Sequence, residues 1–247
     1  MSLQDLRVIG LIQARMGSTR LPGKVLADIE GLPMLGHVIR RLQRVRHCDR
    51  VVVIVPPHDI PILAPVVVRD GVQCLAPPVP EWDLAARHYW AAQFCRADII
   101  LRVPSDNPCI DPAAIEMMLD AWQHEGQLWD NLHQRQLWTN LQPVNGSGWP
   151  DGFGAEVYSL NILEKLHLEA EGQDREHPHL SLVRTGRVKT IPCPPEWCAP
   201  ELRFDVDTAE DLARIRALFA TLGPDFTLAA AIPVMRRLCE MQIDETP

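Results

Sequence analysis

The sequence has no long apolar run and no cysteine framework. None of its apolar stretches approaches the roughly 20 residues that a membrane-spanning helix needs. The opening residues, Met-Ser-Leu-Gln-Asp-Leu-Arg, do not predict a signal peptide, because the apolar run behind them is too short. The seven cysteines are scattered without a Cys-x-x-Cys spacing, which argues against a zinc site and is typical of a reducing compartment. We therefore expect a cytoplasmic protein that does not bind a membrane.

A basic excess is also missing. The 247 residues include 24 Lys and Arg but 32 Asp and Glu, for a net charge of −8. Such a balance argues against a general nucleic-acid binder, which would normally present a basic face. It leaves room for a small anionic nucleotide, because a local cluster of cations sets the field inside a cleft. With 47% hydrophobic and 23% charged residues, the composition is that of a globular protein.

Apolar strand patterns alternate with amphipathic helical patterns along the chain. The sequence predicts buried strands at 8–12, 50–55 and 97–103, and helices from Met34, over 82–96 and from Pro112 to about His124. Such alternation indicates a parallel sheet with right-handed crossovers, whose ligands bind outside the carboxyl ends of the strands. Later patterns predict a strand at 155–159 and helices over 160–170, from Thr208, and over 227–241 with a break at Pro233. The segment 58–68 is ambiguous, because two prolines interrupt it.

The segment Gln13–Lys24 follows the first predicted strand and precedes the first predicted helix. Three cations lie in it among small residues: Arg15, Arg20 and Lys24. Gly17 and Gly23 allow the backbone to approach a ligand closely, and Pro22 stiffens the loop. Fixed cations beside exposed backbone N–H groups suit a polyphosphate. The alternative is a solvated basic loop without a ligand.

This loop is not a Walker A motif. Five residues separate Gly17 from Gly23-Lys24, and Val25 stands where a Ser or Thr would hold Mg²⁺. The order Gln-Ala-Arg-Met-Gly-Ser-Thr-Arg-Leu-Pro-Gly-Lys-Val-Leu instead resembles the triphosphate loop of the cytidylyltransferases that make CMP-activated acidic sugars. It is most similar to the spore coat polysaccharide biosynthesis protein F branch, and the resemblance extends over most of the chain.

The resemblance implies an α/β, three-layer Rossmann-like nucleotide-diphospho-sugar transferase (GT-A-like) fold with a mainly parallel sheet. It implies a single domain over 1–247, with an irregular acceptor-side insertion at about 126–200, and a homodimer. The implied reaction joins CMP from CTP to a sugar, with release of pyrophosphate, in glycan precursor synthesis. Arg15, Lys24 and Arg20 would be catalytic. The implied nucleotide-binding residues are Ala14, Arg15, Gly17, Ser18 and Lys24.

Two aspartates follow predicted strands at distant places in the sequence. Phosphoryl transfer uses Mg²⁺, which proteins hold through one or two carboxylates together with phosphate oxygens. Asp106 and Asp207 match the family segments Asp-x-Pro-Leu-Ile-Asp-Pro and Val-Asp-Thr-Pro-Glu-Asp-Leu, and the resemblance makes them the magnesium ligands. Asp205 shares a face with Asp207 if the segment is extended, so we expect it to assist.

Two further segments resemble the acceptor side of the family. Trp-Pro-Asp-Gly-Phe-Gly-Ala-Glu-Val at 149–157 resembles Tyr-Pro-Asp-Gly-Leu-Asp-Val-Glu-Val, and Asp-Arg-Glu-His-Pro at 174–178 resembles Asp-Arg-Glu-His-Val. The implied acceptor-binding residues are Asp151, Glu156, Arg175, Glu176 and His177. Arg175 is the cation expected to meet an acidic sugar. His177 is either a proton carrier or a structural hydrogen-bonding group.

The sequence departs from the family at two places. The second Asp of the family's Asp-Gly-Leu-Asp stretch is Gly154 here, and a proline-rich segment at 76–83 replaces the family's Gly-Ser-Glu-Asp-Asp stretch near the nucleotide. Two alternative functions stay open, the first because related folds serve both reactions and the second because of the proline-rich replacement. One is a glycosyltransferase that uses a sugar nucleotide, and the other is a non-catalytic nucleotide-binding relative.

Overall fold

The computed structural model describes residues 3–128, 137–139, 146–177, 182, 184–185 and 187–244. Its helices are α1 Met34–Leu42, α2 Ile60–Arg69, α3 Leu84–Cys95, α4 Pro112–Leu128, α5 Leu160–Glu169, α6 Gln173–Glu176, α8 Ala209–Leu222 and α9 Leu228–Asp244. Short 3-10 helices are η1 Leu3–Asp5, η2 Lys24–Leu26, η3 Pro57–Asp59 and η6 Pro195–Trp197. Among the described residues, no helix combines the length and the apolar character needed to cross a membrane.

Within the described part of the chain, seven strands form one sheet in the order β5-β4-β1-β6-β8-β7-β9. These strands are β1 Val8–Gln13, β4 Arg50–Ile54, β5 Gln73–Leu75, β6 Ile99–Pro104, β7 Leu137–Thr139, β8 Glu156–Ser159 and β9 Val188–Lys189. Strand β8 runs antiparallel to β6 and β7, and the remaining pairs are parallel. A separate antiparallel pair joins β2 Asp28–Ile29 to β3 Leu32–Pro33. The predicted mainly parallel α/β sheet is confirmed.

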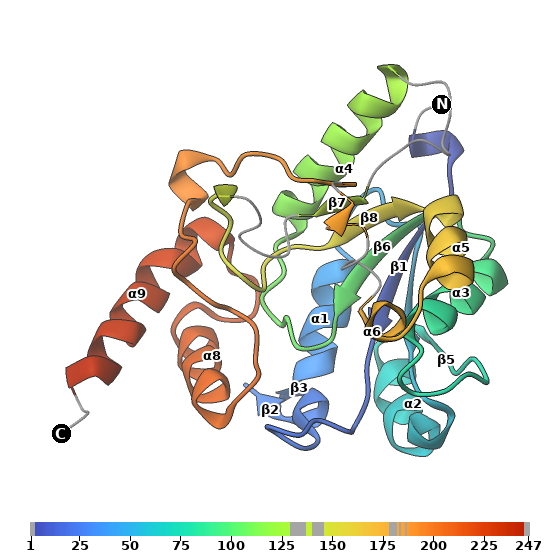
Figure 1. Cartoon of the computed structure of the whole chain (residues 1–247). Helices are drawn as coiled ribbons and strands as arrows, with labels where there is room; N and C mark the ends of the chain where they lie inside the picture. Colours follow the sequence, from blue (N-terminus) through green and yellow to red (C-terminus); the bar gives the residue numbers. More distant parts are fainter. Residues whose placement is uncertain are drawn as a thin grey trace.

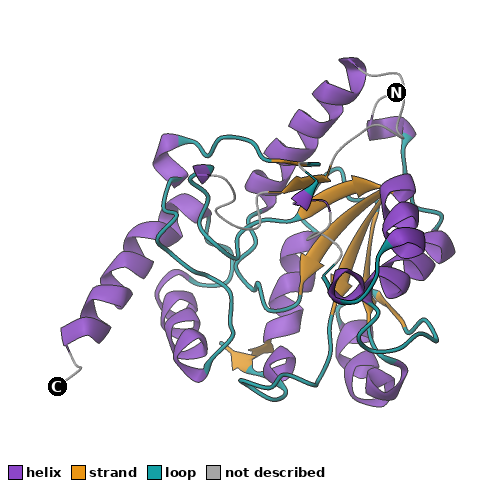
Figure 2. Ribbon diagram, viewed as in Figure 1, coloured by secondary structure: helices purple, strands orange, loops and turns teal. Residues whose placement is uncertain are grey.

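Helices cover both faces of the sheet (Figures 1 and 2). Because side chains alternate along a strand, Val8 and Ile12 of β1 enter the core beneath α1, α2 and α4, whereas Ile9 and Leu11 enter the core beneath α3 and α5. A third apolar cluster packs α8 and α9 against the loops around Trp149 and Phe204. Trp149 is fully buried and Trp138 almost so, as expected for core anchors, and Trp129 lies outside the described residues.

Two proline-containing segments are more helical than the sequence predicts. The ambiguous segment 58–68 becomes α2, with Pro65 inside the helix, because Leu63 and Val67 lie four residues apart and are fully buried. The break predicted at Pro233 is wrong, since α9 continues through it. The apolar residues on both sides, Ile232 and Val234, pack into the α8–α9 core, and this burial outweighs the hydrogen bond that proline removes.

Successive strands are added to the sheet first on one side of β1 and then on the other. Strands β4 and β5 extend the sheet from one side of β1, and β6 then pairs with its other side. In doubly wound sheets this switch point leaves a crevice at the carboxyl ends of the two strands. Gln13 ends β1 opposite Pro104 of β6, and the Ser105 N–H donates to the Gln13 carbonyl over 3.2 Å. The loops that follow β1 and β6 are therefore held side by side.

Candidate active site

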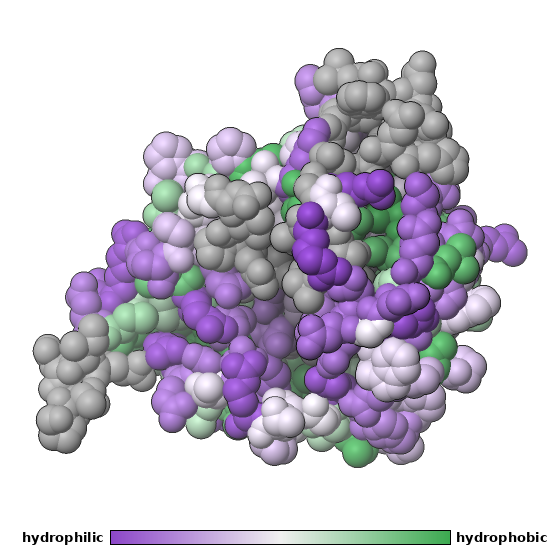
Figure 3. Space-filling model, viewed as in Figure 1, coloured by the Kyte–Doolittle hydropathy of each residue, from purple (hydrophilic) through white to green (hydrophobic). Residues whose placement is uncertain are grey.

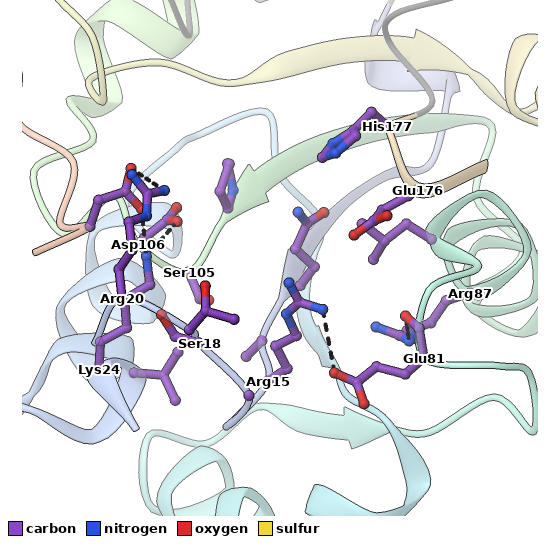
Figure 4. A pocket seen from close by; sticks show the side chains of 18 residues that line it. Arg15, Ser18, Arg20, Lys24, Glu81, Arg87, Ser105, Asp106, Glu176 and His177 are labelled. Atoms are coloured by element: carbon purple, nitrogen blue, oxygen red, sulfur yellow. Dashed lines mark hydrogen bonds and ion pairs between the residues drawn. The ribbon is translucent and has the colours of Figure 1, made fainter. Parts of the chain in front are cut away.

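The Lys24 ammonium group lies between two carboxylates from distant parts of the chain. Its Nζ donates to Asp106 Oδ2 and to Asp207 Oδ1, each over 3.0 Å, and to the Val206 carbonyl over 2.6 Å. The Lys24 side chain is only 10% exposed, and those of Asp106 and Asp207 are 31% and 17% exposed. Figure 4 shows Lys24 reaching toward Asp106, with Arg20 beside it. The structure thus brings together the loop lysine and the two predicted metal ligands.

Local structure explains this convergence. Gly23 adopts a left-handed conformation with φ of 70°, which turns the chain into η2 so that Lys24 starts the helix. Asp106 follows β6, and its carbonyl accepts from the Val206 N–H over 2.8 Å, which ties the two aspartate loops together. Thr208 then starts α8 with a capping box, in which its side chain accepts from the Asp211 N–H. The helix start predicted at Thr208 is confirmed, and it fixes Asp207 directly before the helix.

Two arginines add to the positive charge around Asp207. Arg20 Nη2 lies 2.9 Å and Arg203 Nη2 lies 3.3 Å from Asp207 Oδ2. Partial burial alone would raise the pKa of Asp207, but Lys24, Arg20 and Arg203 together lower it below the ordinary value. Asp207 is therefore ionised at neutral pH and is suited to a metal cation.

Asp205 and Asp151 lie next to this site, around Arg203. Asp205 Oδ1 accepts from Arg203 Nε over 3.0 Å, and Arg203 Nε lies 3.8 Å from Asp151 Oδ2. Burial, followed by repulsion from Asp205, raises the pKa of Asp151 to about 6, although Arg203 opposes the shift. Asp205, which was expected to assist Asp207 in holding Mg²⁺, shares Arg203 with Asp207 and accepts hydrogen bonds from this arginine.

The loop after β1 is held in shape by its own backbone and by one buried carboxylate. The Met16 carbonyl accepts from the N–H groups of Ser18 and Gly23 over 3.0 and 3.1 Å, and the Met16 N–H donates to Asp59 Oδ2 over 2.9 Å. Asp59 comes from η3, after β4, and is buried. Arg15 extends away from Lys24 and forms an exposed ion pair with Glu81, 3.4 Å long. Arg15 and Lys24 are therefore on different sides of the loop.

A pocket of about 300 Å³ opens over this loop. Hydrophilic residues surround the hollow at the centre of this face of the molecule (Figure 3). Predicted nucleotide, catalytic, metal and acceptor residues that line the pocket are Ala14, Arg15, Gly17, Ser18, Arg20, Lys24, Asp106, Asp207, Glu176 and His177. Lys24, Arg20 and Asp106 lie at one side of it, and Glu81, Arg87 and Glu176 lie at the other (Figure 4). Asp205, Asp151, Glu156 and Arg175 are not part of the lining.

The carboxylates at Lys24 fit a magnesium ion that arrives with a nucleotide. Asp106 and Asp207 approach the same ammonium group and provide oxygen atoms, which are the ligands that Mg²⁺ prefers. Among the described residues, no three His, Cys, Asp or Glu side chains form a metal cluster. A nucleotide-borne Mg²⁺ does not need three, because phosphate oxygens and water complete its shell.

Of the three predicted acceptor residues that do not line the pocket, Arg175 and Glu156 are bonded to other side chains of the protein. Arg175 donates twice to Asp83 Oδ2, over 2.7 and 2.9 Å, and also to the carbonyls of His167 and Ala170. It therefore ties α6 to the start of α3, and the geometry does not support its expected role as the cation for an acidic sugar. This tie holds α6 at the pocket rim, where Glu176, the last residue of the helix, and His177 line the pocket.

Glu156 lies inside the sheet. It pairs with Arg102 across the β6–β8 register, with Arg102 Nη1 2.6 Å from Glu156 Oε2, and both side chains are buried. The geometry therefore does not support direct acceptor binding by Glu156. A charged residue on a buried strand requires a partner of opposite charge, and this pair satisfies that requirement.

Three residues at the site were not identified from the sequence. Arg203 bridges the acidic side chains near Asp207, Asp59 holds the loop after β1, and Arg102 contacts Gln13, which lines the pocket. Arg102 interrupts the apolar run 97–103, and this interruption was the available signal, because a charge within a buried strand needs a structural or functional reason.

Gly152 gives a test of how closely the Asp151 loop must approach Asp205. It has φ of 87°, and a Cβ atom there would lie 2.5 Å from the Asp205 nitrogen. Gly71 has a similar φ of 75° with nothing within 4 Å of a Cβ atom, so it is a matched control. Both alanine variants bear the strain of the left-handed conformation, but only Gly152→Ala adds a backbone clash.

We expect Gly152→Ala to lower Tm by roughly 5–10 °C more than Gly71→Ala, measured by circular dichroism. An equal loss in both variants would show that the two loops are not in tight contact.

Comparisons with known proteins found similar sequences and folds. The family model of cytidylyltransferases matches residues 9–145. The chain is 26% identical to the spore coat polysaccharide biosynthesis protein SpsF of Bacillus subtilis, over 93% of this chain and 94% of the relative. It is 37% identical to a 3-deoxy-manno-octulosonate cytidylyltransferase of Bradyrhizobium diazoefficiens, over 94% of this chain and 92% of the relative.

A solved structure of similar fold is that of a cytidylyltransferase from Leptospira borgpetersenii. It superposes with a TM-score of 0.83 at 27% sequence identity and covers 98% of this chain and 99% of the other. The seven-stranded sheet, the cationic loop and the family match over more than half of the chain lead to one conclusion. The chain belongs to the cytidylyltransferase family and is a nucleotidyltransferase.

Proposed function

We propose that this enzyme transfers CMP from CTP to a small sugar, with Mg²⁺ bound and with release of pyrophosphate. The observation that supports this most strongly is the Lys24 ammonium group held 3.0 Å from both Asp106 and Asp207, beside the cationic loop. The sugar is acidic, as the name of the Bradyrhizobium relative indicates for that protein. The product feeds surface polysaccharide synthesis, as the name of the Bacillus relative indicates for that one.

The loop after β1 supplies the triphosphate site. In this proposal Lys24 and Arg15 hold phosphate oxygens, and Arg20, which is 62% exposed, reaches over them. Backbone groups at Ala14, Gly17 and Ser18 line the same pocket and contact the nucleotide. Arg15 leaves its exposed pair with Glu81 for this purpose at little cost, because exposed ion pairs contribute at most about 1 kcal/mol.

Asp106 and Asp207 would hold Mg²⁺, and Asp205 would support Asp207 from the neighbouring position. When bound, Mg²⁺ neutralises the triphosphate and the charge that develops on the leaving pyrophosphate. The protein residues orient the reactants and exclude water, and the acceptor oxygen attacks the α-phosphorus in line. Lys24 and Arg20 stabilise the negative charge of the departing pyrophosphate.

In this proposal the predicted acceptor residues that contact the acceptor are Glu176, His177 and Asp151. Glu176 and His177 line the pocket, and Asp151 lies beside the metal site through Arg203. Arg175 and Glu156 contribute indirectly in this proposal, because they hold α6 and β8 in place. We also propose that the chain is a single domain, that it acts in the cytoplasm and that it forms homodimers.

A nucleotide screen tests the proposed reaction. We expect CTP with Mg²⁺ to raise Tm more than ATP, GTP or UTP, because a ligand that binds only the folded state stabilises it by mass action. We then expect pyrophosphate release from CTP when an acidic sugar from a panel of 2-keto-3-deoxy acids is added. If a nucleotide sugar stabilises the protein and CTP does not, the glycosyltransferase alternative is correct. Stabilisation by CTP without release on any acceptor would favour a non-catalytic relative.

A further inference from the structure

A chain of three polar side chains crosses three neighbouring strands below the pocket. Gln13 ends β1, Arg102 lies on β6 and Glu156 lies on β8. Arg102 Nε donates to Gln13 Oε1 over 2.8 Å, and Arg102 Nη1 donates to Glu156 Oε2 over 2.6 Å. Arg102 and Glu156 are only 5% and 4% exposed. These three hydrogen-bonded side chains therefore connect the buried interior of the sheet to Gln13, a residue of the pocket wall.

This arrangement fixes the orientation of the Gln13 amide. An arginine side chain can only donate, so the amide atom that faces Arg102 must be the oxygen. The carboxylate of Glu156 holds the guanidinium in turn. The amide nitrogen has no protein partner among the described residues, and it is left with two N–H groups for a ligand. Gln13 lines the pocket, so these donors are available there.

The donors lie on the side of the pocket away from the metal ligands. Gln13 follows Ile9 and Leu11 on the sheet face that α3 covers, by the alternation of side chains along β1. Leu84 and Arg87 of α3 line the pocket, and so does Glu81, just before this helix. Figure 4 shows Glu81, Arg87 and Glu176 opposite Lys24 and Asp106. A nucleotide whose phosphates lie at Lys24 would place its base toward the α3 side.

Cytosine and uracil differ in the hydrogen-bonding groups that they present to such a wall. Cytosine presents N3 and O2 as adjacent acceptors and a 4-amino donor, whereas uracil presents an N3–H donor and an O4 acceptor. The amide N–H groups of Gln13 match N3 and O2 of cytosine. The carboxylates of Glu81 and Glu176 lie on the same side of the pocket and match the 4-amino group. Uracil would set donor against donor and acceptor against acceptor.

We propose that Gln13 determines the preference for cytosine, and that Arg102 and Glu156 are positioning residues that keep its amide nitrogen directed at the base. This inference rests on the proposed function, because it assumes that CTP occupies the pocket. It adds a side chain that selects the base to the backbone groups at Ala14 and Ser18 that line the same pocket. A glutamine without such a partner could rotate its amide and accept uracil as readily.

The test compares CTP and UTP binding by isothermal titration calorimetry with Mg²⁺ and without acceptor. We expect Gln13→Glu to reduce the CTP:UTP affinity ratio by about tenfold or more, because a carboxylate oxygen would replace the N–H donors and repel cytosine N3. Gln93→Glu, on the exposed surface of α3, is the matched control and should leave the ratio unchanged. If the CTP:UTP affinity ratio of Gln13→Glu differs from that of the wild type by less than threefold, the inference is overturned. This holds whether the affinities for CTP and UTP are both unchanged or both reduced.

A double variant tests the positioning residues. In Arg102→Gln, Glu156→Gln the buried charges are removed together, so no unpaired ion remains, and the amide introduced on β6 can donate or accept. The Gln13 amide is then free to rotate, and we expect UTP affinity to rise toward that of CTP, with the ratio falling at least threefold. If Arg102 and Glu156 serve stability alone, the double variant would be less stable but its folded form would keep the wild-type CTP:UTP affinity ratio, and this result would contradict the positioning role.

If the wild-type protein binds no CTP, the proposed function itself fails. If it prefers CTP and Gln13→Glu keeps that preference, only this inference fails.

Discussion

Replacing Asp207 by asparagine is expected to lower kcat/KM for CTP-dependent pyrophosphate release by about a thousandfold or more, with the fold intact. The substitution keeps the shape of the side chain and an oxygen that can accept from Lys24. It removes the negative charge that three cations surround and that a divalent metal would require. Loss of transition-state charge stabilisation commonly costs two to three orders of magnitude, and loss of a metal ligand adds to that.

Metal binding gives a second readout for this variant. We expect Mn²⁺ to bind Asp207→Asn at least about tenfold more weakly than the wild type in the presence of CTP, measured by electron paramagnetic resonance of free Mn²⁺. Glu201→Gln is a suitable control, because Glu201 is an exposed carboxylate that pairs with Arg236 outside the pocket. Wild-type turnover in Asp207→Asn would remove this residue from the proposed metal site.

Replacing Lys24 by methionine is expected to lower turnover strongly and to strengthen metal binding. The ammonium group lies 3.0 Å from each of the two carboxylates, where it competes with any cation for the same oxygens. Two like charges a few ångströms apart repel by several kcal/mol at the effective dielectric of a protein surface, although the flexible lysine can move away. We therefore expect Lys24→Met to bind Mn²⁺ at least about tenfold more tightly than the wild type without nucleotide.

Turnover in the same variant should fall by about a hundredfold or more, because the triphosphate loses the cation that the loop is built to present. Lys165→Met is the matched control, since Lys165 is exposed on α5. If Lys24 only held the two carboxylates together, its loss would let them move apart and would weaken metal binding. Tighter metal binding together with lost activity would therefore distinguish a triphosphate-binding lysine from a purely structural one. Asp207→Asn and Lys24→Met are thus expected to shift metal affinity in opposite directions.

The sequence was sufficient for the parts of the site that follow from strand ends and motif matches. Asp106 and the loop after β1 both follow the carboxyl ends of predicted parallel strands, where ligands bind, and the pairing of Gln13 with Pro104 places these two strand ends side by side. Asp207 lies 183 residues from Lys24, and no local pattern relates the two. The family resemblance alone predicts Asp207 as a metal ligand. In the structure, its carboxylate accepts a hydrogen bond from the Lys24 ammonium group, as that of Asp106 does.

The sequence was insufficient where a side chain's direction depends on its neighbours in space. Glu156 and Arg175 match family motifs, but one is paired across the sheet with Arg102 and the other holds the cap of α3 at Asp83. Whether a polar side chain faces a pocket or a partner is decided by sheet register and helix packing, which single-sequence patterns do not contain. Helix α9 continues through Pro233 for a related reason, because core burial on both sides outweighs a local helix breaker.

The central claim is that the loop after β1, Asp106 and Asp207 form one site for a metal-bound triphosphate. A crystal structure with Mn²⁺ and a CTP analogue that cannot be hydrolysed between the α- and β-phosphates tests it most directly. We predict an anomalous peak bonded to oxygens of Asp106, Asp207 and the analogue, with Lys24 moved from the carboxylates onto a phosphate. Mn²⁺ bound elsewhere, or an analogue whose phosphates do not contact the loop at Lys24, would contradict the account.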